Sequence, residues 1–186
     1  MKTIRIGGAC AFFGDSSVAP TQLIAAGTDY LILDYLAEAT MSALGSMRNH
    51  RADLGYATDF TEWVWKDNLA ELKRTGTKIV TNAGGVNPRA CLARMEKIAA
   101  EAGHSFRIAI VEGDEVMDRL DELSAQAELF TAAPFPPQDK VVTANAYLGA
   151  GPIARALAMG ADVVITGRCV DSALTLGILV HEFDWK

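Results

Sequence analysis

Short apolar runs that end in polar residues recur along this chain, and they limit its fold more than any other feature. Residues 163–165 are Val-Val-Ile, with no polar residue between them. Such a run is typical of a strand buried on both faces of a parallel sheet. The run ends at Thr166 and Gly167, presents Arg168, and returns to an apolar helical pattern after Asp171. The chain repeats this order of strand, polar tip and helix.

The repeat predicts one α/β domain that spans residues 1–186. Alternating strands and helices favour a mostly parallel sheet of about six strands, with helices on both faces in a Rossmann-like, three-layer arrangement. The expected strands are residues 3–9, 29–34, 77–81, 106–111, 141–145 and 163–165. A single helix is expected over residues 60–74 and a short, charged helix over residues 116–126.

Polar and glycine residues follow the expected strands, and the carboxyl ends of parallel strands meet at one edge of the sheet. Ligands bind at this edge in open α/β sheets. The sequence therefore predicts a site there. Its candidate residues are Gly7, Gly8, Asp15, Ser16, Asp34, Glu38, Asn82, Gly84, Gly85, Asn87, Asn145, Gly149, Thr166, Gly167, Arg168, Asp171 and Ser172.

Glycine precedes a predicted helix start at several of these corners. Free backbone N–H groups and the helix dipole make such a corner suitable for a phosphate, a carboxylate or a thioester oxygen. Glycine and Asn-Pro pairs are also ordinary turn and cap residues, and Asn87 is a plausible N-cap before Pro88.

Arg168, Asp34 and Glu38 are the candidate catalytic residues. The Arg168 guanidinium could hold a carboxylate or phosphate with two hydrogen bonds. It could equally form a buried salt bridge with Asp34 or Asp171, and Asp171 could instead cap the last helix. Asp34 and Glu38 could serve in acid–base chemistry or bind a hard metal ion, or they could be a cap and a surface charge.

Several cofactor classes lack a signature. No G-x-G-x-x-G follows a strand and there is no P-loop motif, so neither a nicotinamide cofactor nor ATP is expected. No metal site is predicted, because the three histidines are isolated from one another and from the cysteines. The cysteines are expected as buried thiols, although Cys10 and Cys169, near strand ends, could be nucleophiles.

Charge and hydropathy limit the partners. With 23 acidic and 17 basic residues, a net charge of −6, the chain has no nucleic-acid footprint. It has no run of about twenty apolar residues and no signal peptide, so we expect a soluble, cytoplasmic protein without a membrane partner.

Several spaced motifs resemble the acyclic terpene utilisation AtuA family. They are Ile6-Gly-Gly-Ala9, Asp15-Ser16, Leu31-Ile-Leu-Asp-Tyr-Leu-Ala-Glu38, Thr81-Asn-Ala-Gly-Gly-Val-Asn-Pro88, Ala144-Asn-Ala-Tyr-Leu-Gly-Ala150 and Val164-Ile-Thr-Gly-Arg-Cys-Val-Asp-Ser172. The chain resembles the N-terminal part of the longer family proteins.

The resemblance implies a role in the breakdown of acyclic terpenoids, whose intermediates are acyl-CoA thioesters. It points to an enzyme, or the binding half of one, that acts on a small carboxylate or a branched acyl-CoA, with lyase-type chemistry. Asn82 and Asn145 would orient a carbonyl. The expected partners are a small-molecule substrate, further copies of the chain, or a separate C-terminal half. The alternative is a non-catalytic binding or assembly module, with Trp63, Trp65 and the last helix as its partner face.

Overall fold

The protein, described here by a computed structural model for residues 2–185, has five β-strands and seven α-helices. The strands are β1 (Ile6–Cys10), β2 (Tyr30–Leu33), β3 (Lys78–Thr81), β4 (Ile108–Val111) and β5 (Val163–Thr166). The α-helices are α1 (Ala19–Ala25), α2 (Glu38–His50), α3 (Lys66–Thr75), α4 (Pro88–Glu101), α5 (Leu120–Leu123), α6 (Ala150–Ala158) and α7 (Ala173–Phe183).

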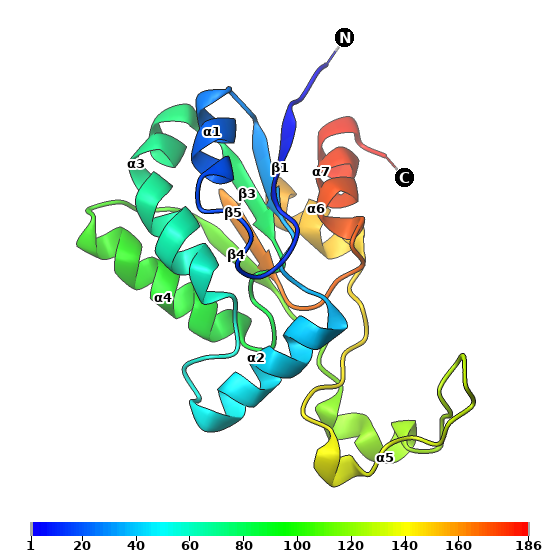
Figure 1. The fold of residues 1–186 in the computed structure, drawn as a ribbon. Helices are drawn as coiled ribbons and strands as arrows, with labels where there is room; N and C mark the ends of the chain where they lie inside the picture. Colours follow the sequence, from blue (N-terminus) through cyan, green and yellow to red (C-terminus); the bar gives the residue numbers. More distant parts are fainter. Residues whose placement is uncertain (1, 186) are drawn as a thin grey trace.

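All strand pairs of the sheet are parallel, in the order β1-β2-β3-β5-β4. Helices α1, α3 and α4 cover one face and α6 and α7 the other (Figure 1). The chain moves across the sheet in one direction up to β4 and then turns back to β5. Because crossovers between parallel strands are right-handed, this reversal places α6 on the opposite face. The predicted three-layer α/β fold with a parallel sheet is confirmed.

The uninterrupted apolar runs reflect burial on both faces of the sheet. Val163 and Ile165 belong to the core that α1, α3 and α4 cover, whereas Val164 belongs to the core beneath α6 and α7. Successive side chains of a strand point to opposite faces, so a central strand needs apolar residues at every position.

The prediction of a sixth strand at residues 141–145 is wrong. This segment makes one isolated antiparallel bridge, between Asn145 and Glu115, and does not join the sheet. It packs against α2 instead. A Cβ added at Gly45 would lie 2.3 Å from Thr143 Cγ2 and 3.0 Å from the Val142 carbonyl oxygen. The short apolar run therefore makes a helix contact rather than a sheet contact.

Two predicted helices also differ from the observed ones. The helix expected over residues 60–74 begins as a π-helix, η1 (Phe60–Trp65), and continues as α3. Trp65 is fully buried and its Nε1 donates to the Met95 carbonyl at 2.9 Å, whereas Trp63 is 42% exposed. Trp65 is therefore a core residue. The helix expected over residues 116–126 is reduced to a 3₁₀ turn, η2 (Met117–Arg119), and the single turn α5.

Residues 115–145 form an arm that extends away from the sheet (Figure 1). The arm includes a further 3₁₀ turn, η3 (Gln138–Lys140). Its two ends lie together, because Val116 N donates to the Ala144 carbonyl at 2.8 Å and Ala146 N donates to the Asp114 carbonyl at 2.6 Å. The returning half of the arm then runs beside α2 at the carboxyl end of the sheet. No helix among the described residues is both long and apolar enough to cross a membrane.

Candidate functional site

A pocket of about 400 Å³ lies at the carboxyl edge of the sheet, between α2 and the returning half of the arm. We call it the Arg168 pocket. Its lining combines polar and apolar side chains from α2, the arm, the segment that follows the arm and the loop after β5. They are Glu38, Met41, Ser42, Pro136, Lys140, Val141, Val142, Thr143, Asn145, Tyr147 and Arg168. Its volume is within the range of small-molecule sites.

Arg168 is the buried cation of this pocket, with 4% of its surface exposed. Its Nη1 donates to Asp171 Oδ1 and to the Cys169 carbonyl, both at 3.0 Å. Its Nη2 donates to the Tyr147 hydroxyl at 3.1 Å, and the guanidinium carbon lies 4.2 Å from the centroid of the Tyr147 ring. The salt bridge to Asp171 that the sequence allowed is present, and the rest of the guanidinium faces Tyr147.

The Nε atom of Arg168 is buried and has no hydrogen-bond partner among the described residues. An unsatisfied buried donor costs about 1–3 kcal/mol. The guanidinium therefore keeps unused hydrogen-bonding capacity in a site where a cation is already held out of water.

Glu38 meets Arg168 at the mouth of the pocket. Its Oε1 accepts a hydrogen bond from the Tyr147 hydroxyl and lies 3.5 Å from Arg168 Nη2. The Tyr147 hydrogen bond lowers the pKa of Glu38, with a smaller contribution from the Arg168 charge. The same bond raises the pKa of Tyr147. Because the Glu38 side chain is 81% exposed, it can leave this position without moving the backbone.

Asp114 supports the pocket from behind. Its carboxylate accepts Arg168 N at 2.8 Å and Asn145 Nδ2 at 2.9 Å, and only 5% of the residue is exposed. Burial raises the pKa of Asp114. A Cβ added at Gly167 would lie 2.2 Å from Asp114 Oδ1, so Gly167 is required for this close approach. Asp114 thus links the end of the arm to the start of the loop between β5 and α7, which we call the Arg168 loop.

Asp34 and Asn82 form a second polar pair at the same edge. Asn82 Nδ2 donates to Asp34 Oδ1 at 2.6 Å, and Asn82 Oδ1 accepts Tyr35 N at 2.7 Å. Asn82 is fully buried, and these contacts use both functional groups of its amide. Neither Asp34 nor Asn82 lines the Arg168 pocket, so the three candidate catalytic residues divide into a Glu38–Arg168 pair and a separate Asp34.

A family model described as acyclic terpene utilisation family protein AtuA matches residues 4–186. The chain belongs to the AtuA family. The resemblance inferred from the spaced motifs is thus confirmed, and the match covers nearly all of the chain. No curated protein and no solved structure gives a significant match to this AtuA-family chain.

The motif residues at the start of the AtuA-family chain form the turn between β1 and α1. Asp15 Oδ2 accepts Ala11 N at 2.9 Å, and Ser16 Oγ accepts Ala19 N at 3.1 Å. In β1, Gly7 leaves room for Leu23 of α1 and for Thr28, whereas a Cβ at Gly8 would make only an ordinary contact with Ile32 at 4.0 Å. These four candidate residues lie outside the lining of the Arg168 pocket.

The motif residues after β3 hold the next loop. Asn87 caps α4, as expected, by accepting Ala90 N at 3.3 Å, and its Nδ2 donates to the Ala52 and Leu54 carbonyls. A Cβ at Gly84 would lie 2.5 Å from the Thr166 carbonyl oxygen, and Gly85 has a φ of +55°. Gly84, Gly85 and Asn87 therefore shape a packed turn beside β5.

The remaining candidates lie at the starts of α6 and α7. Gly149 and Ser172 are the N-cap residues, and neither helix has a side-chain cap hydrogen bond. Thr166 is fully buried and its hydroxyl donates to the Gly167 carbonyl at 2.7 Å. The side chain of Asp171 binds Arg168 and does not cap α7.

Burial opposes ionisation of the cysteine thiols. It raises the pKa of Cys10 to about 12 and also raises the pKa of Cys169. A thiol that stays protonated is a poor nucleophile. Among residues 2–185, no three His, Cys, Asp or Glu side chains gather into a group that could hold a metal ion.

Tyr147 and Asp114, like Lys140, are site residues that were not among the candidates from the sequence. Tyr147 lies in the Asn145-Ala-Tyr147 motif, but its partner Glu38 is 109 residues away. Asp114 follows β4 by three positions, and this placement at a strand end was the available signal.

Proposed function

We propose that this AtuA-family chain binds a small carboxylate or a branched acyl-CoA thioester in the Arg168 pocket. It would act as an enzyme, or as the binding half of one, in acyclic terpenoid or carboxylate catabolism. The observation that carries the proposal is the buried Arg168 guanidinium, whose Nη2 meets Tyr147 and Glu38 in the lining of a 400 Å³ pocket.

The anionic group of the ligand would take the place of Glu38 beside Arg168. The Glu38 contact with Nη2 is long, at 3.5 Å, and its side chain is mostly in water, so little is lost when it moves. A ligand carboxylate would then accept hydrogen bonds from Arg168 Nη2 and the Tyr147 hydroxyl. Lys140 supplies a second positive charge in the pocket lining. Charge-assisted hydrogen bonds of this kind are stronger than neutral ones.

The rest of the pocket favours an apolar ligand body. Met41, Pro136, Val141 and Val142 line it beside the charged groups. A ligand that joins an anionic or thioester head to a branched hydrocarbon would bury its apolar part against these side chains. A simple inorganic anion would leave this wall in contact with water.

For lyase-type chemistry, Glu38 is the base that the pocket supports. Its pKa is lowered chiefly by the Tyr147 hydrogen bond, then by its own backbone N–H, and less by Arg168. A ligand that takes over Tyr147 and Arg168 removes two of these causes, so the basicity of Glu38 would rise next to the ligand. It would accept the proton of a ligand hydroxyl as the adjacent C–C bond breaks, and Arg168 would stabilise the enolate oxygen that receives the electron pair.

The alternative is a binding or assembly module that performs no reaction. The observation in its favour is that Asp34, the other candidate base, is bonded to Asn82 outside the pocket. The charged and phenolic side chains within the pocket are then Glu38, Lys140, Tyr147 and Arg168 among the described residues. Turnover of a bound ligand distinguishes the two functions.

The test is a thermal-shift titration with CoA, acyl-CoA thioesters, dicarboxylates and divalent metal ions. A ligand that binds the folded state raises the melting temperature with its concentration. We expect a shift with a branched acyl-CoA or a dicarboxylate that is lost in Arg168→Ala and reduced in Tyr147→Phe. Arg74→Ala, which removes an exposed arginine on α3, is the matched control and should bind normally.

Circular dichroism checks that each variant is folded, because Arg168 is buried. Tyr147 is 46% exposed, so Tyr147→Phe tests the pocket without disturbing the core. Equal shifts in wild type and both pocket variants would contradict the proposed site. Mass spectrometry of the bound thioester then separates the functions: turnover that Glu38→Gln abolishes while binding persists supports the enzyme, and binding without turnover supports the module.

A further inference from the structure

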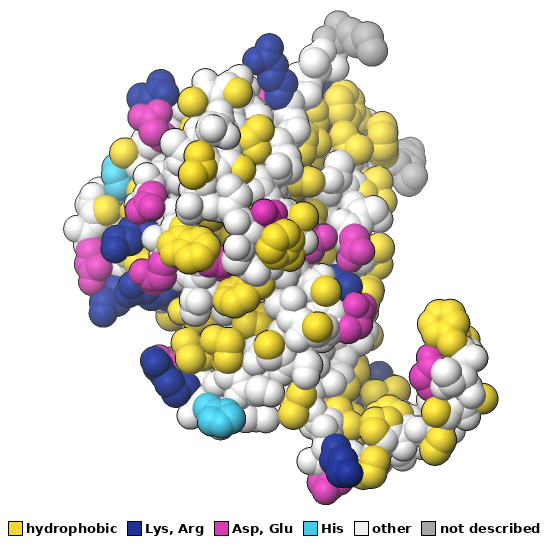
Figure 2. All heavy atoms as spheres, viewed as in Figure 1, with side chains coloured by type: hydrophobic (Ala, Val, Ile, Leu, Met, Phe, Trp, Pro, Cys, Tyr) yellow, Lys and Arg dark blue, Asp and Glu magenta, His cyan; other side chains and the backbone are white. Residues whose placement is uncertain are grey.

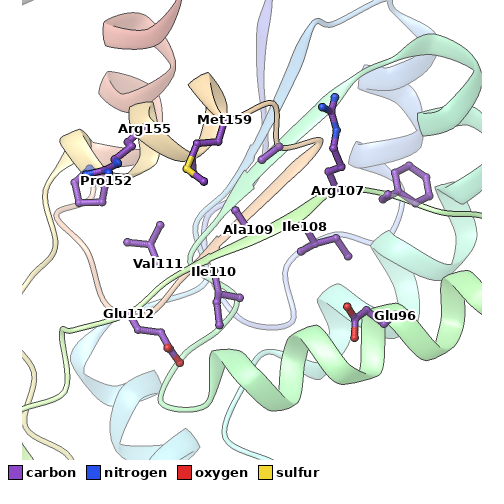
Figure 3. Close-up of a pocket in the computed structure, with 13 residues that line it drawn as sticks. Glu96, Arg107, Ile108, Ala109, Ile110, Val111, Glu112, Pro152, Arg155 and Met159 are labelled. Atoms are coloured by element: carbon purple, nitrogen blue, oxygen red, sulfur yellow. The ribbon is translucent and has the colours of Figure 1, made fainter.

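A second cavity lies away from the Arg168 pocket, along the edge strand β4. It is a trough of about 760 Å³ whose floor is β4 and whose walls are α4 and α6. Figure 3 shows β4 crossing this trough, with Ile108 and Ile110 directed toward α4 and with Ala109 and Val111 on the opposite side. The floor is apolar, and nothing among the described residues covers it.

β4 is an edge strand that contains no proline, no charged residue and no register shift. Val163 N donates to the Arg107 carbonyl and Gly167 N donates to the Val111 carbonyl, so alternate residues of β4 face β5. The N–H and C=O groups of Ile108 and Ile110 therefore point toward the open side. The other edge strand, β1, is interrupted by a register shift between Gly8 and Cys10, which discourages pairing there.

We propose that two copies of this chain join through their β4 strands, antiparallel and about a two-fold axis, to form one continuous sheet. Ala109 would lie opposite Ala109 of the second copy at the axis. Ile108 would then face Ile110 of the second copy, and these two residues would exchange their outward N–H and C=O groups. The run Ile-Ala-Ile reads the same in both directions, so this register repeats on both sides of the axis.

The flanking helices allow this pairing. Both α4 and α6 contact β4 and β5, so we place the axis of each helix above the space between these two strands, roughly half a strand spacing inward of β4. With strands about 4.8 Å apart, the two α4 helices of a dimer would be separated by about two spacings, or roughly 10 Å. Packed helices lie about 8–10 Å apart, so α4 would contact its copy on one face and α6 its copy on the other.

Side chains on the α4 face suit this register. Phe106 of the second copy would lie opposite Glu112, and Lys73 Nζ lies 5.0 Å from the Phe106 ring centroid. The register therefore brings Lys73 of the second copy toward Glu112. The half-buried Ile108 and Ile110 would become fully buried against each other.

Glu96 is the group that opposes the dimer. Glu96 lies on α4 beside the Ile108 end of β4 (Figure 3). In the dimer the two Glu96 carboxylates would lie on neighbouring α4 helices, on either side of the two-fold axis, and their repulsion would weaken the dimer.

The first test is sedimentation velocity of the 186-residue chain from about 1 to 200 µM. We expect a monomer–dimer equilibrium that Glu96→Gln shifts toward the dimer by about two- to threefold, because exposed like charges on neighbouring helices repel weakly through water. Ile110→Lys and Ile110→Pro should give monomers. Ile110→Pro removes an outward N–H and keeps the ladder to β5, because that ladder uses Ala109 and Val111. Val18→Lys changes an apolar residue with 58% exposure elsewhere and is the matched control.

Hydrogen exchange gives a residue-specific signature of the same contact. The amides of Ile108 and Ile110 should exchange slowly in concentrated samples and quickly in dilute ones, while the Ala109 and Val111 amides remain protected in both. A wild-type monomer at every concentration would overturn the proposal. So would a dimer that persists in folded Ile110→Pro, or protection of Ile108 and Ile110 that is independent of concentration.

Discussion

Gly167→Ala tests the close approach between the Arg168 loop and Asp114. The new Cβ would lie 2.2 Å from Asp114 Oδ1 and 2.6 Å from its Cγ, whereas unstrained contacts exceed about 3.4 Å. The carboxylate must therefore retreat by about 1 Å, and the bonds that it accepts from Arg168 N at 2.8 Å and from Asn145 Nδ2 at 2.9 Å would be lost or stretched beyond use.

The expected loss follows from those two bonds. A buried amide left without an acceptor costs about 1–3 kcal/mol, and a hydrogen bond to a charged acceptor contributes about 1.5–3 kcal/mol. Partial relaxation of the loop around Asp114 reduces the expected loss of folding stability to about 3 kcal/mol. Alanine also restricts the unfolded chain more than glycine does, which offsets about 0.5 kcal/mol of this loss. The net loss of about 2.5 kcal/mol corresponds to about 5–10 °C in melting temperature for a domain of this size.

Urea denaturation and differential scanning calorimetry measure this loss. Gly151→Ala is the matched control, because a Cβ at Gly151 meets nothing within 4 Å and the residue lies in the first turn of α6. That variant should be unchanged or stabilised by up to about 1 kcal/mol. If Gly167→Ala were as stable as wild type to within about 0.5 kcal/mol, Asp114 would not occupy the position described, and the account of the pocket's support would fail.

Three further predictions concern buried groups. Burial raises the pKa of Asp114 above its usual 3.8, so the folded wild type retains a proton that the unfolded chain releases. The free energy of unfolding of the wild type therefore falls as the pH rises from 3.8 through the pKa of the folded state. In urea denaturation, Asp114→Asn should cost less stability relative to wild type at about pH 7 than at about pH 4, and a cost independent of pH would contradict this. With a pKa of about 12, Cys10 is thiolate in only about one molecule in 10⁴ at pH 8, so Ellman's reagent should find no rapidly reacting thiol in the native protein and three after denaturation. Trp65→Phe removes the bond to the Met95 carbonyl and leaves a cavity, so it should cost about 2–3 kcal/mol in urea unfolding, and a cost below about 1 kcal/mol would show that the indole N–H contributes nothing.

The sheet was predictable because its signal is local. Val163, Val164 and Ile165 are apolar in succession since each lies in one of the two cores, and the glycine and polar residues that follow mark the turn into a helix. The extra strand at residues 141–145 was predicted wrongly because an extended apolar run has the same composition whether it pairs with a strand or packs on a helix. Only the tertiary contact with Gly45 distinguishes the two cases.

The site was only partly predictable, because contacts between distant segments create it. Arg168 and Glu38 were identified from their positions at strand ends, and the structure brings them within 3.5 Å. Tyr147 could not be paired with Glu38 from sequence, because the path of the arm determines that contact. Asp34 was an equally good candidate by its position after a strand. In the structure, however, its carboxylate accepts a hydrogen bond from Asn82 at the same edge of the sheet, outside the Arg168 pocket.

The two ends of the arm are bonded to each other, so residues 115–145 could be replaced as one unit. Bonds between residues 116 and 144 and between 114 and 146 join its ends, so the sheet does not depend on the length of chain between them. Loops whose ends are already held together accept insertions and deletions at little entropic cost. The returning half of the arm forms one wall of the Arg168 pocket. Replacement of residues 115–145 would therefore change the apolar side of the pocket, while the buried Arg168 stays in place.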